Sequence, residues 1–345
     1  MKLLIITQTV SNEDPVLGFF VEWIRTFAAK FEGVQVICLY EGTHDLPENV
    51  QVHSLGKEQG VGKLTYLYRF YTYVWQLRHQ YDAVFVHMNQ EYVLLAGALW
   101  KLLGKRVYLW RNHYAGSPLT HIAAAFCTKV FCTSRHSYTA RFSKTVLMPV
   151  GVDLRPFENL SSIVRAPRSI LFLSRIAPSK RTEMLIDALG MLLAKGISFT
   201  SSVYGSPLLE DESYYESLKV RAESAGLHDR IRFYPGIPHS ATPAIYAAHD
   251  IFVNCSPSGM FDKTLFEAAA AGCRVIAASE DFRDAAGDMA YAPTVNILAE
   301  RLQEVLEADD DELVRSRLHM HALSKEESLA TLADRLVIAM NIAYS

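Results

Sequence analysis

Two basic residues stand close together in a segment that joins an apolar run to a helical pattern. Arg175 and Lys180 lie in the sequence Ser-Arg-Ile-Ala-Pro-Ser-Lys, which starts where the strand-like run 170–174 ends, and a helical pattern begins near Thr182. Two cations on a loop that opens a helix can hold an anion from two directions, while the helix N-terminus adds its dipole. The segment suits a diphosphate, and a solvated basic loop is the alternative.

A second loop of this kind follows the apolar run 251–255. Its serine, proline and glycine residues lead into an alanine-rich helical stretch, which again presents free backbone N–H groups at a helix start. Glu267 falls in the first turns of this helix, where a carboxylate can accept hydrogen bonds from sugar hydroxyls. A surface glutamate that favours the helix dipole is the alternative. The small residues 268–271 allow close packing and predict a dense site around Glu267.

These loops need a framework, and the sequence predicts one of alternating strands and helices. Short β-branched or apolar runs recur with amphipathic stretches between them, which indicates an α/β fold of two doubly wound parallel sheets. Ligands of such sheets gather at the carboxyl ends of the strands, and we expect the two edges to face each other across a cleft. The expected strands are 3–7, 34–39, 83–87, 107–110, 130–133, 146–148, 170–174, 199–204, 231–234, 251–255 and 274–277.

The domain organisation follows from a break in this alternation. Turn-forming and polar residues are concentrated at 149–167, which indicates a linker. We therefore expect one Rossmann-like domain at 1–150 and a second at 151–327. The last segment, 328–345, carries a helical pattern that either closes the second domain or returns to the first.

Composition narrows the classes of protein. Half of the 345 residues are hydrophobic, enough for two cores, and no apolar run approaches the roughly 20 residues of a spanning helix. No secretory leader pattern is present, so we expect the mature chain to begin at its first strand. The five scattered cysteines predict buried, reduced thiols in a cytoplasmic protein. Residues 1–150 carry a net charge of +5 and the remainder −8, so the first half suits a phospholipid surface or a phosphorylated acceptor better than nucleic acid.

In its second half the chain resembles the retaining GT-B glycosyltransferases of the large GT4 family. Several spaced motifs carry the resemblance together. They are Ser-Arg-Ile-x-x-x-Lys at 174–180, Val-Tyr-Gly-Ser at 203–206, the segment 229–236, the stretch Glu-Ala-Ala-Ala-Ala-Gly-Cys-Arg-Val-Ile at 267–276, and Gly-Val-Asp at 151–153, which looks like the interdomain signature.

The resemblance implies roles for particular residues. Arg175 and Lys180 hold the donor diphosphate, Glu267 binds the nucleotide ribose, and His113 lies beside the donor sugar. The loop that begins near Ile237 flanks the base. The other donor-binding residues that the resemblance implies are Gly18, Gly205, Gly259, Met260, Phe261, Asp262, Lys263, Thr264 and Leu265.

The chain departs from the family pattern at one position. The family commonly has a second glutamate eight positions before the ribose-binding one, and Gly259 occupies that place here. A subgroup that lacks this glutamate carries an Asp-Lys pair, as this chain does at Asp262 and Lys263. We therefore expect activity to be kept, with Asp262 or Lys263 in contact with the sugar hydroxyls.

The first half matches the family less closely, as expected of a domain that reads a variable acceptor. Gly18 follows the loop 11–17 and lets the backbone approach a transferred sugar or phosphate. His87 and His113 each come directly after an expected strand. Polar residues at strand ends often satisfy loop backbone, which is the alternative for both histidines.

A third feature is the helical stretch Lys63–Tyr81, in which basic and aromatic residues alternate. At helical spacing, Leu64, Leu67, Tyr71, Val74 and Leu77 are predicted to face the core. The remaining face, with aromatic rings and an arginine, suits a lipid headgroup boundary or a lipid-linked acceptor, and simple packing is the alternative. The residues predicted on this second face are Tyr66, Arg69, Phe70 and Tyr73.

The implied function is a metal-independent, retaining hexosyltransferase. Its donor is a UDP- or GDP-linked sugar and its acceptor a hydroxyl of a glycan or lipid-linked molecule, in cell-envelope polysaccharide or glycolipid assembly. We expect a cytoplasmic protein on the inner face of the membrane, with no cofactor. The acidic run 309–311 is interpreted as a helix cap rather than a metal site. A catalytically silent binding protein of this fold and a nucleotide-sugar epimerase are the alternatives.

Overall fold

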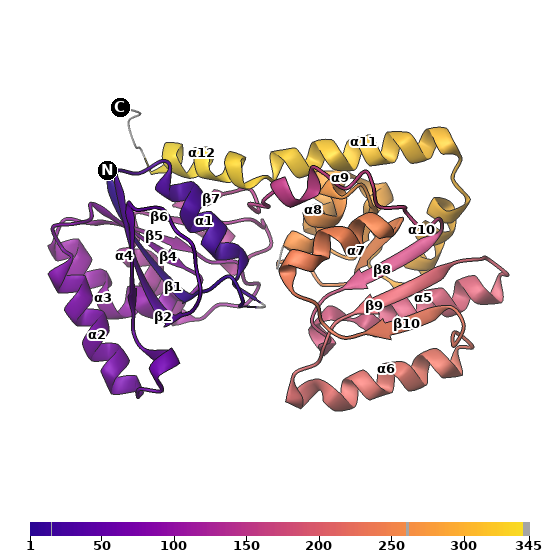
Figure 1. The fold of residues 1–345 in the computed structure, drawn as a ribbon, viewed down its shortest axis with the longest axis horizontal. Helices are drawn as coiled ribbons and strands as arrows, with labels where there is room; N and C mark the ends of the chain where they lie inside the picture. Colours follow the sequence, from indigo (N-terminus) through magenta and orange to yellow (C-terminus); the bar gives the residue numbers. More distant parts are fainter. Residues whose placement is uncertain (15, 260–261, 341–345) are drawn as a thin grey trace. The chain divides into compact units, whose positions relative to one another are not determined.

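The computed structural model describes residues 1–14, 16–259 and 262–340, which form two compact units. Unit 1 comprises Met1–Gly151 and Leu329–Ser345, and unit 2 comprises Val152–Ser328 (Figure 1). Met260 and Phe261, both expected to bind the donor, lie outside the described residues.

Unit 1 is built on a parallel sheet in the order β3-β2-β1-β4-β5-β6-β7. The strand order reverses between β1 and β4, which makes this the switch point of a doubly wound sheet. The strands are β1 (Lys2–Val10), β2 (Gly33–Glu41), β3 (Val50–Ser54), β4 (Ala83–His87), β5 (Arg106–Trp110), β6 (Lys129–Cys132) and β7 (Thr145–Leu147).

Helices cover both faces of this sheet because each face is apolar (Figure 1). α1 (Phe19–Ala28) and α12 (Leu329–Ala339) pack on one face, and α2 (Lys63–Gln76), α3 (Gln90–Leu102) and α4 (Pro118–Phe126) pack on the other. Polar contacts also fix α12 on unit 1. Lys30 Nζ lies 2.8 Å from Asp334 Oδ1, and Arg106 Nη1 donates to the Met340 carbonyl at 3.0 Å.

Unit 2 repeats the design with a parallel sheet in the order β10-β9-β8-β11-β12, reversed between β8 and β11. Its strands are β8 (Ser169–Leu173), β9 (Thr200–Tyr204), β10 (Ile231–Tyr234), β11 (Ile251–Asn254) and β12 (Arg274–Ala277). Its helices are α5 (Thr182–Ala194), α6 (Glu212–Ser224), α7 (Thr242–Ala248), α8 (Lys263–Ala270), α9 (Glu280–Ala286), α10 (Val295–Glu307) and α11 (Asp310–Glu326).

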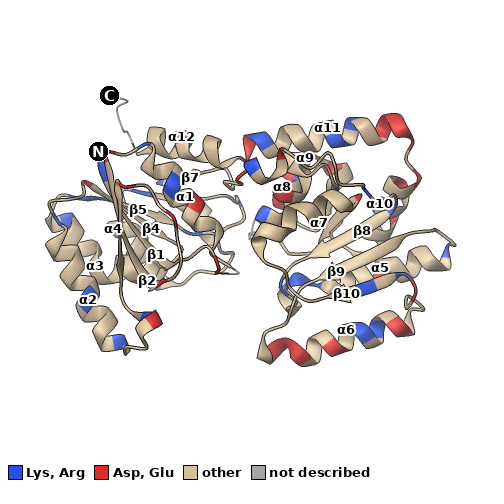
Figure 2. Cartoon of the chain, viewed as in Figure 1, with Lys and Arg blue, Asp and Glu red and all other residues tan. Residues whose placement is uncertain are grey.

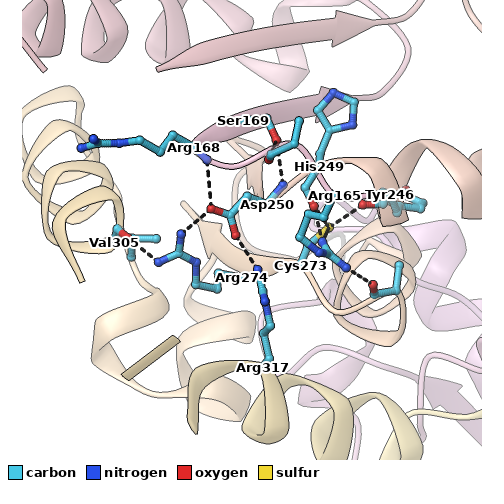
Figure 3. A network of polar contacts seen from close by, with 12 residues as sticks. Arg165, Arg168, Ser169, Tyr246, His249, Asp250, Cys273, Arg274, Val305 and Arg317 are labelled. Carbon is cyan, nitrogen blue, oxygen red and sulfur yellow. Dashed lines mark hydrogen bonds and ion pairs between the residues drawn. The ribbon is translucent and has the colours of Figure 1, made fainter. Parts of the chain in front are cut away.

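A buried ion cluster holds the start of β11 (Figure 3). Asp250 Oδ2 accepts a hydrogen bond from Arg274 Nη2 at 2.7 Å, and Asp250 Oδ1 accepts one from Arg317 Nη2 at 2.9 Å. The side chains of Asp250 and Arg274 are only 6% and 5% exposed. Because Arg317 belongs to α11, the cluster ties that helix to the strand that leads into the predicted donor loop.

The predicted faces of α2 need correction. Phe70 is buried, whereas Leu64 is 84% exposed and Leu67 and Tyr71 are each 38% exposed. Tyr66 and Tyr73, which were predicted to face outward, are partly buried and pack against the core. The side chain of Arg69 donates a hydrogen bond to the Leu55 carbonyl. Val74 and Leu77 are buried, as predicted. Apolar and aromatic residues occur all round this helix, so their spacing alone did not single out the inner face.

All five cysteines are buried and unpaired in the structure, as the sequence predicted. Burial raises the pKa of Cys127 and Cys255 to about 12, which keeps both thiols protonated. Among the described helices, none combines the length and the apolar character that crossing a bilayer requires.

Candidate functional site

The carboxyl ends of β8 and β11 lie side by side because these strands pair where the strand order reverses. The loop after β8 ends in the short 3₁₀ helix Pro178–Lys180, and the loop after β11 leads to Asp262, the N-cap of α8. Lys180 Nζ lies 2.8 Å from Asp262 Oδ2 and 3.3 Å from Ser256 Oγ. The structure thus brings a predicted cation to the N-terminal end of α8.

Asp262 is the centre of this cluster. Its Oδ2 also accepts hydrogen bonds from Ser256 Oγ at 2.8 Å and from Asn254 Nδ2 at 3.1 Å. Burial acts to raise the pKa of Asp262, but the charge of Lys180 and these hydrogen bonds outweigh it and hold the pKa below its ordinary value. Asp262 is therefore ionised at neutral pH, and it fixes the position of the Lys180 ammonium through a charge-assisted bond.

Arg175 is placed differently from Lys180. It follows β8, is exposed, and its side chain makes no hydrogen bond or ion pair with any residue that the structure describes. Its backbone carbonyl accepts a bond from Ser174 Oγ at 2.9 Å. The guanidinium has room to reorient, and its contact with an anion stays a prediction.

Glu267 lies in the second turn of α8, with only 7% of its side chain exposed. Ala268 and Ala269 beside it are fully buried, so the predicted dense packing is confirmed. Tyr246 Oη donates to Glu267 Oε2 at 3.3 Å, and His239 Nε2 lies 3.0 Å from Glu267 Oε1. The sequence did not single out these two partners.

Lys263 stands at the first position of α8. Burial lowers its pKa to about 7, although the nearby carboxylates of Glu267 and Asp153 act in the opposite direction. At neutral pH its protonated and neutral forms are therefore both populated. An anion placed beside it would raise its pKa and favour the protonated form. Thr264 and Leu265 have structural contacts: Thr264 Oγ1 accepts from Asn254 Nδ2 at 3.3 Å, and Leu265 is buried in the core.

The backbone explains why glycine occupies position 259. Gly259 has a φ of +91°, a conformation in which a residue with a Cβ is strained. Its N–H donates to Asp281 Oδ2 at 2.8 Å, and Asp281 is buried in the first turn of α9. Position 259, where the resemblance leads us to expect a glutamate, thus has a local need for glycine, and Asp281 is an acidic residue that the sequence did not single out.

Gly205 and Ile237 lie in loops that follow β9 and β10. A Cβ at Gly205 would collide with the carbonyl oxygen of Ser174, so glycine allows these two strand ends to approach each other. Ile237 is half-buried, and the preceding Gly236 N–H donates to Ser206 Oγ at 2.9 Å. Both residues therefore lie at the carboxyl edge of the unit 2 sheet.

In unit 1, local packing accounts for two of the predicted residues. A Cβ at Gly18 would collide with the carbonyl oxygen of Asp14, so the turn before α1 itself requires glycine. His87 is buried and stacks on Phe20 with ring centroids 3.9 Å apart. Its Nδ1 also lies 3.3 Å from Thr7 Oγ1, so packing and a side-chain hydroxyl hold the ring, and a functional role for His87 stays a prediction.

His113 follows β5 and satisfies its own loop. Its Nδ1 accepts a hydrogen bond from the Ala115 N–H at 3.0 Å, and its ring stacks on Tyr114 at 4.6 Å between centroids. Nδ1 also lies 3.1 Å from the carbonyl oxygen of Ala115, so both contacts tie the ring to its own loop. A contact between His113 and a donor sugar stays a prediction.

The acidic run at 309–311 begins a helix, as interpreted from the sequence. Asp309 is the N-cap of α11, and its Oδ1 accepts a hydrogen bond from the Glu312 N–H at 2.8 Å. Asp310 and Asp311 fall in the first turn, where they favour the helix dipole.

Two parallel doubly wound units in one chain define a GT-B fold, the architecture that the sequence predicted, and solved structures agree. The structure of Anabaena HepE in complex with UDP and glucose matches with a TM-score of 0.78 and 18% identity, over 99% of this chain and 100% of that one. Residues 160–313, all within unit 2, match the family Glycosyl transferases group 1. The family match thus lies wholly within unit 2 and covers less than half of the chain.

Curated relatives match over shorter stretches. The chain is 32% identical over 112 residues to the UDP-N-acetylglucosamine-peptide N-acetylglucosaminyltransferase GtfA subunit of Streptococcus gordonii, which covers 32% of this chain and 21% of that protein. It is 29% identical over 153 residues to alpha-monoglucosyldiacylglycerol synthase of Streptococcus pneumoniae, covering 41% and 33%. The matched stretches thus span about a third or less of these relatives.

Proposed function

We propose that the protein transfers a sugar from a nucleoside-diphosphate sugar to a hydroxyl group of an acceptor. The observation that carries this proposal is the position of Lys180 at the N-terminal end of α8, the helix that also carries the buried Glu267. The step from Asp262 to Glu267 is about 7.5 Å along the helix axis. A diphosphate beside Lys180 and a ribose beside Glu267 can therefore belong to one nucleotide. The family match and the nucleotide in HepE support this donor class.

In the proposed reaction the bond between C1 of the sugar and the β-phosphate oxygen breaks, and negative charge builds on the leaving diphosphate. Lys180 and the N–H groups at the start of α8 are fixed in place to stabilise that charge. Arg175 supplies a second cation. A phosphate oxygen of the donor takes the proton of the acceptor hydroxyl as the new C1–O bond forms on the same face, so that the configuration at C1 is retained.

We extend the proposal to a GT4-type enzyme that needs no metal ion and acts in the cytoplasm. Cationic side chains and helix N–H groups take the role that a metal ion has in other transferases. The likeness to an alpha-monoglucosyldiacylglycerol synthase and the basic first half support a glycolipid or lipid-linked acceptor in the cell envelope. The names of the relatives do not favour a silent binding protein or an epimerase.

Nucleotide binding and product analysis test this function. UDP or GDP at about one hundred times its Kd should stabilise the protein by about 2.7 kcal/mol in thermal unfolding, with or without EDTA. The anomeric configuration of the product, read by NMR, should equal that of the donor sugar. A protein that neither binds any nucleoside diphosphate nor transfers any sugar contradicts the proposal, whereas inversion contradicts only the retaining mechanism.

We also propose that the outer face of α2 contacts an anionic membrane. Figure 2 shows basic residues and no acidic residue along this helix. The guanidinium of Arg78, just beyond α2, lies 4.3 Å from the ring centroid of the exposed Trp75, a pair suited to the headgroup region. The exposed apolar stripe at helical spacing consists of Leu64, Leu67, Tyr68, Tyr71 and Trp75.

Sedimentation with vesicles of anionic phospholipid at low salt tests the membrane contact. The wild-type protein should pellet with the vesicles. Full burial of a large apolar side chain is worth about 1.5 to 3 kcal/mol, so the double change Leu64→Ser and Trp75→Ser should lower partitioning at least about tenfold. Leu209→Ser, at a site on unit 2 that is 85% exposed, is the matched control and should pellet normally. A wild-type protein that stays in the supernatant contradicts the idea.

A further inference from the structure

His239 is the exposed member of the pair that it forms with Glu267. Its side chain is 46% exposed, against 7% for the glutamate, and Nε2 lies 3.0 Å from Glu267 Oε1. The histidine begins a single 3₁₀ turn, His239–Ala241, in the loop between β10 and α7. No sequence motif required a histidine here, yet it covers the carboxylate that is proposed to bind ribose.

The other partner of Glu267 is fixed. Tyr246 is fully buried, with its ring packed on Phe252 at 5.4 Å between centroids, and its Oη donates to Glu267 Oε2. Burial raises the pKa of Tyr246 well above its ordinary value, so this hydroxyl always carries its proton. A ligand cannot arrive from the side of a fully buried tyrosine. Of the two described hydrogen-bond partners of the Glu267 carboxylate, only His239 reaches the solvent, so a ligand would approach from its side.

We propose that His239 is a displaceable cover on the ribose-binding carboxylate, and that the cis-diol of a ribonucleotide reaches Glu267 by taking the place of the imidazole. This inference rests on the proposed donor site and adds to it a residue that controls ribose binding. The two hydroxyls of the diol replace the bond that the imidazole gives up, so the carboxylate stays paired throughout. Displacement moves only a side chain on a short turn, while Tyr246 keeps the carboxylate oriented.

Displacement of His239 from Glu267 should release a proton. The hydrogen bond to Glu267 raises the pKa of His239, against the effect of its own burial. When the diol takes over Glu267, the imidazole loses that bond, its pKa falls toward the ordinary value of about 6.5, and a proton leaves. Ribose binding should therefore strengthen as pH rises through this interval and become constant above the raised pKa.

Other groups face the same pair and must be separated from it. Lys263 and Asp153 both act on the pKa of His239, Lys263 lowering it and Asp153 raising it, and Tyr246 stays protonated. Lys263 takes up a proton when a diphosphate binds, which opposes the signal from His239. The diphosphate itself also titrates near about pH 6. These contributions affect the binding of a nucleotide equally whether or not it has ribose hydroxyls. The ratio of the affinities for the two kinds of nucleotide therefore reports only the displacement of His239.

The experiment is calorimetric titration with UDP and with 2′,3′-dideoxy-UDP, or with the guanine pair if GDP binds more tightly. In the wild-type protein, the ratio of the two affinities should rise about threefold to tenfold between about pH 6 and pH 8. In His239→Gln, which keeps a neutral donor, the ratio should not change with pH. His228→Gln is the matched control, because His228 also pairs with a carboxylate, at 3.0 Å from Asp229 Oδ2, but on the surface.

The outcomes are distinguishable. A pH-independent ratio in the wild-type protein, or an unchanged pH dependence in His239→Gln with a wild-type circular dichroism spectrum, overturns the cover while leaving the donor site intact. Equal affinities for the ribose and dideoxyribose nucleotides show that Glu267 does not bind the diol, which also overturns it. If neither nucleotide of either pair binds, the proposed function fails, and this inference fails with it.

Discussion

Replacement of Lys180 by alanine should lower turnover by about a hundredfold or more, since loss of one donor that stabilises developing charge typically has this effect. The structure gives the reason. Lys180 Nζ is held 2.8 Å from Asp262 Oδ2 at the start of α8, where the charge of the leaving diphosphate would grow. Steady-state assays with the nucleotide sugar that the protein is found to use measure the effect, and it should appear mainly in kcat.

The control variants separate charge from folding. Lys180→Ala leaves the buried Asp262 without its cation, so the double variant with Asp262→Asn should recover stability but not activity. Arg175→Ala should also lower turnover about a hundredfold. It should do so without loss of stability, because the side chain is exposed. Lys195→Ala removes a surface lysine whose ammonium donates to Gln303 Oε1 at 2.9 Å, and this variant should keep normal rates. Near-normal turnover in both Lys180→Ala and Arg175→Ala refutes the assigned roles.

The framework that positions these residues was largely readable from the sequence. Buried parallel strands appear as short apolar runs, and each expected run became a strand within a few residues of its predicted bounds. The edge strand β3 was missed because its five residues, Val50–Ser54, alternate polar and apolar types and are largely half-buried. Such a short alternating run looks like a loop when it is read without its partner, β2.

Residues of the candidate site could be predicted from the sequence only where a local pattern identifies them. Lys180 follows a strand and precedes a helix within a few residues, and Glu267 lies in the first turns of a helix. The local sequence pattern was therefore enough to single out both residues. His239 and Asp281 lie 28 and 22 residues from their respective partners, Glu267 and Gly259, and only the tertiary structure brings them together. The prediction of the buried and exposed faces of α2 was wrong for a related reason. Tyrosine occurs both in cores and on surfaces, and only tertiary packing determines where each tyrosine lies.

Replacement of Asp250 by alanine should destabilise unit 2 by about 3 to 5 kcal/mol, because it leaves the buried guanidinium of Arg274 without its counter-charge. Figure 3 shows that the Asp250 carboxylate lies at the centre of the cluster, where it also accepts a hydrogen bond from Arg317 of α11. Since all four tryptophans, Trp23, Trp75, Trp100 and Trp110, belong to unit 1, their fluorescence follows that unit. Far-ultraviolet circular dichroism in urea reports both units, so a loss of dichroism that precedes the change in fluorescence marks the unfolding of unit 2.

An exposed ion pair on the same unit provides the matched comparison. Arg221 Nη2 lies 2.7 Å from Asp187 Oδ2, with side chains 49% and 31% exposed. Solvent screens this pair, so Asp187→Ala should cost no more than about 1 kcal/mol. Asp250→Ala together with Arg274→Met removes both buried charges and should recover much of the lost stability, because the cost comes from an unpaired charge rather than from a missing attraction. Equal destabilisation by Asp250→Ala and Asp187→Ala would mean that water reaches the cluster and that burial does not set its energetics.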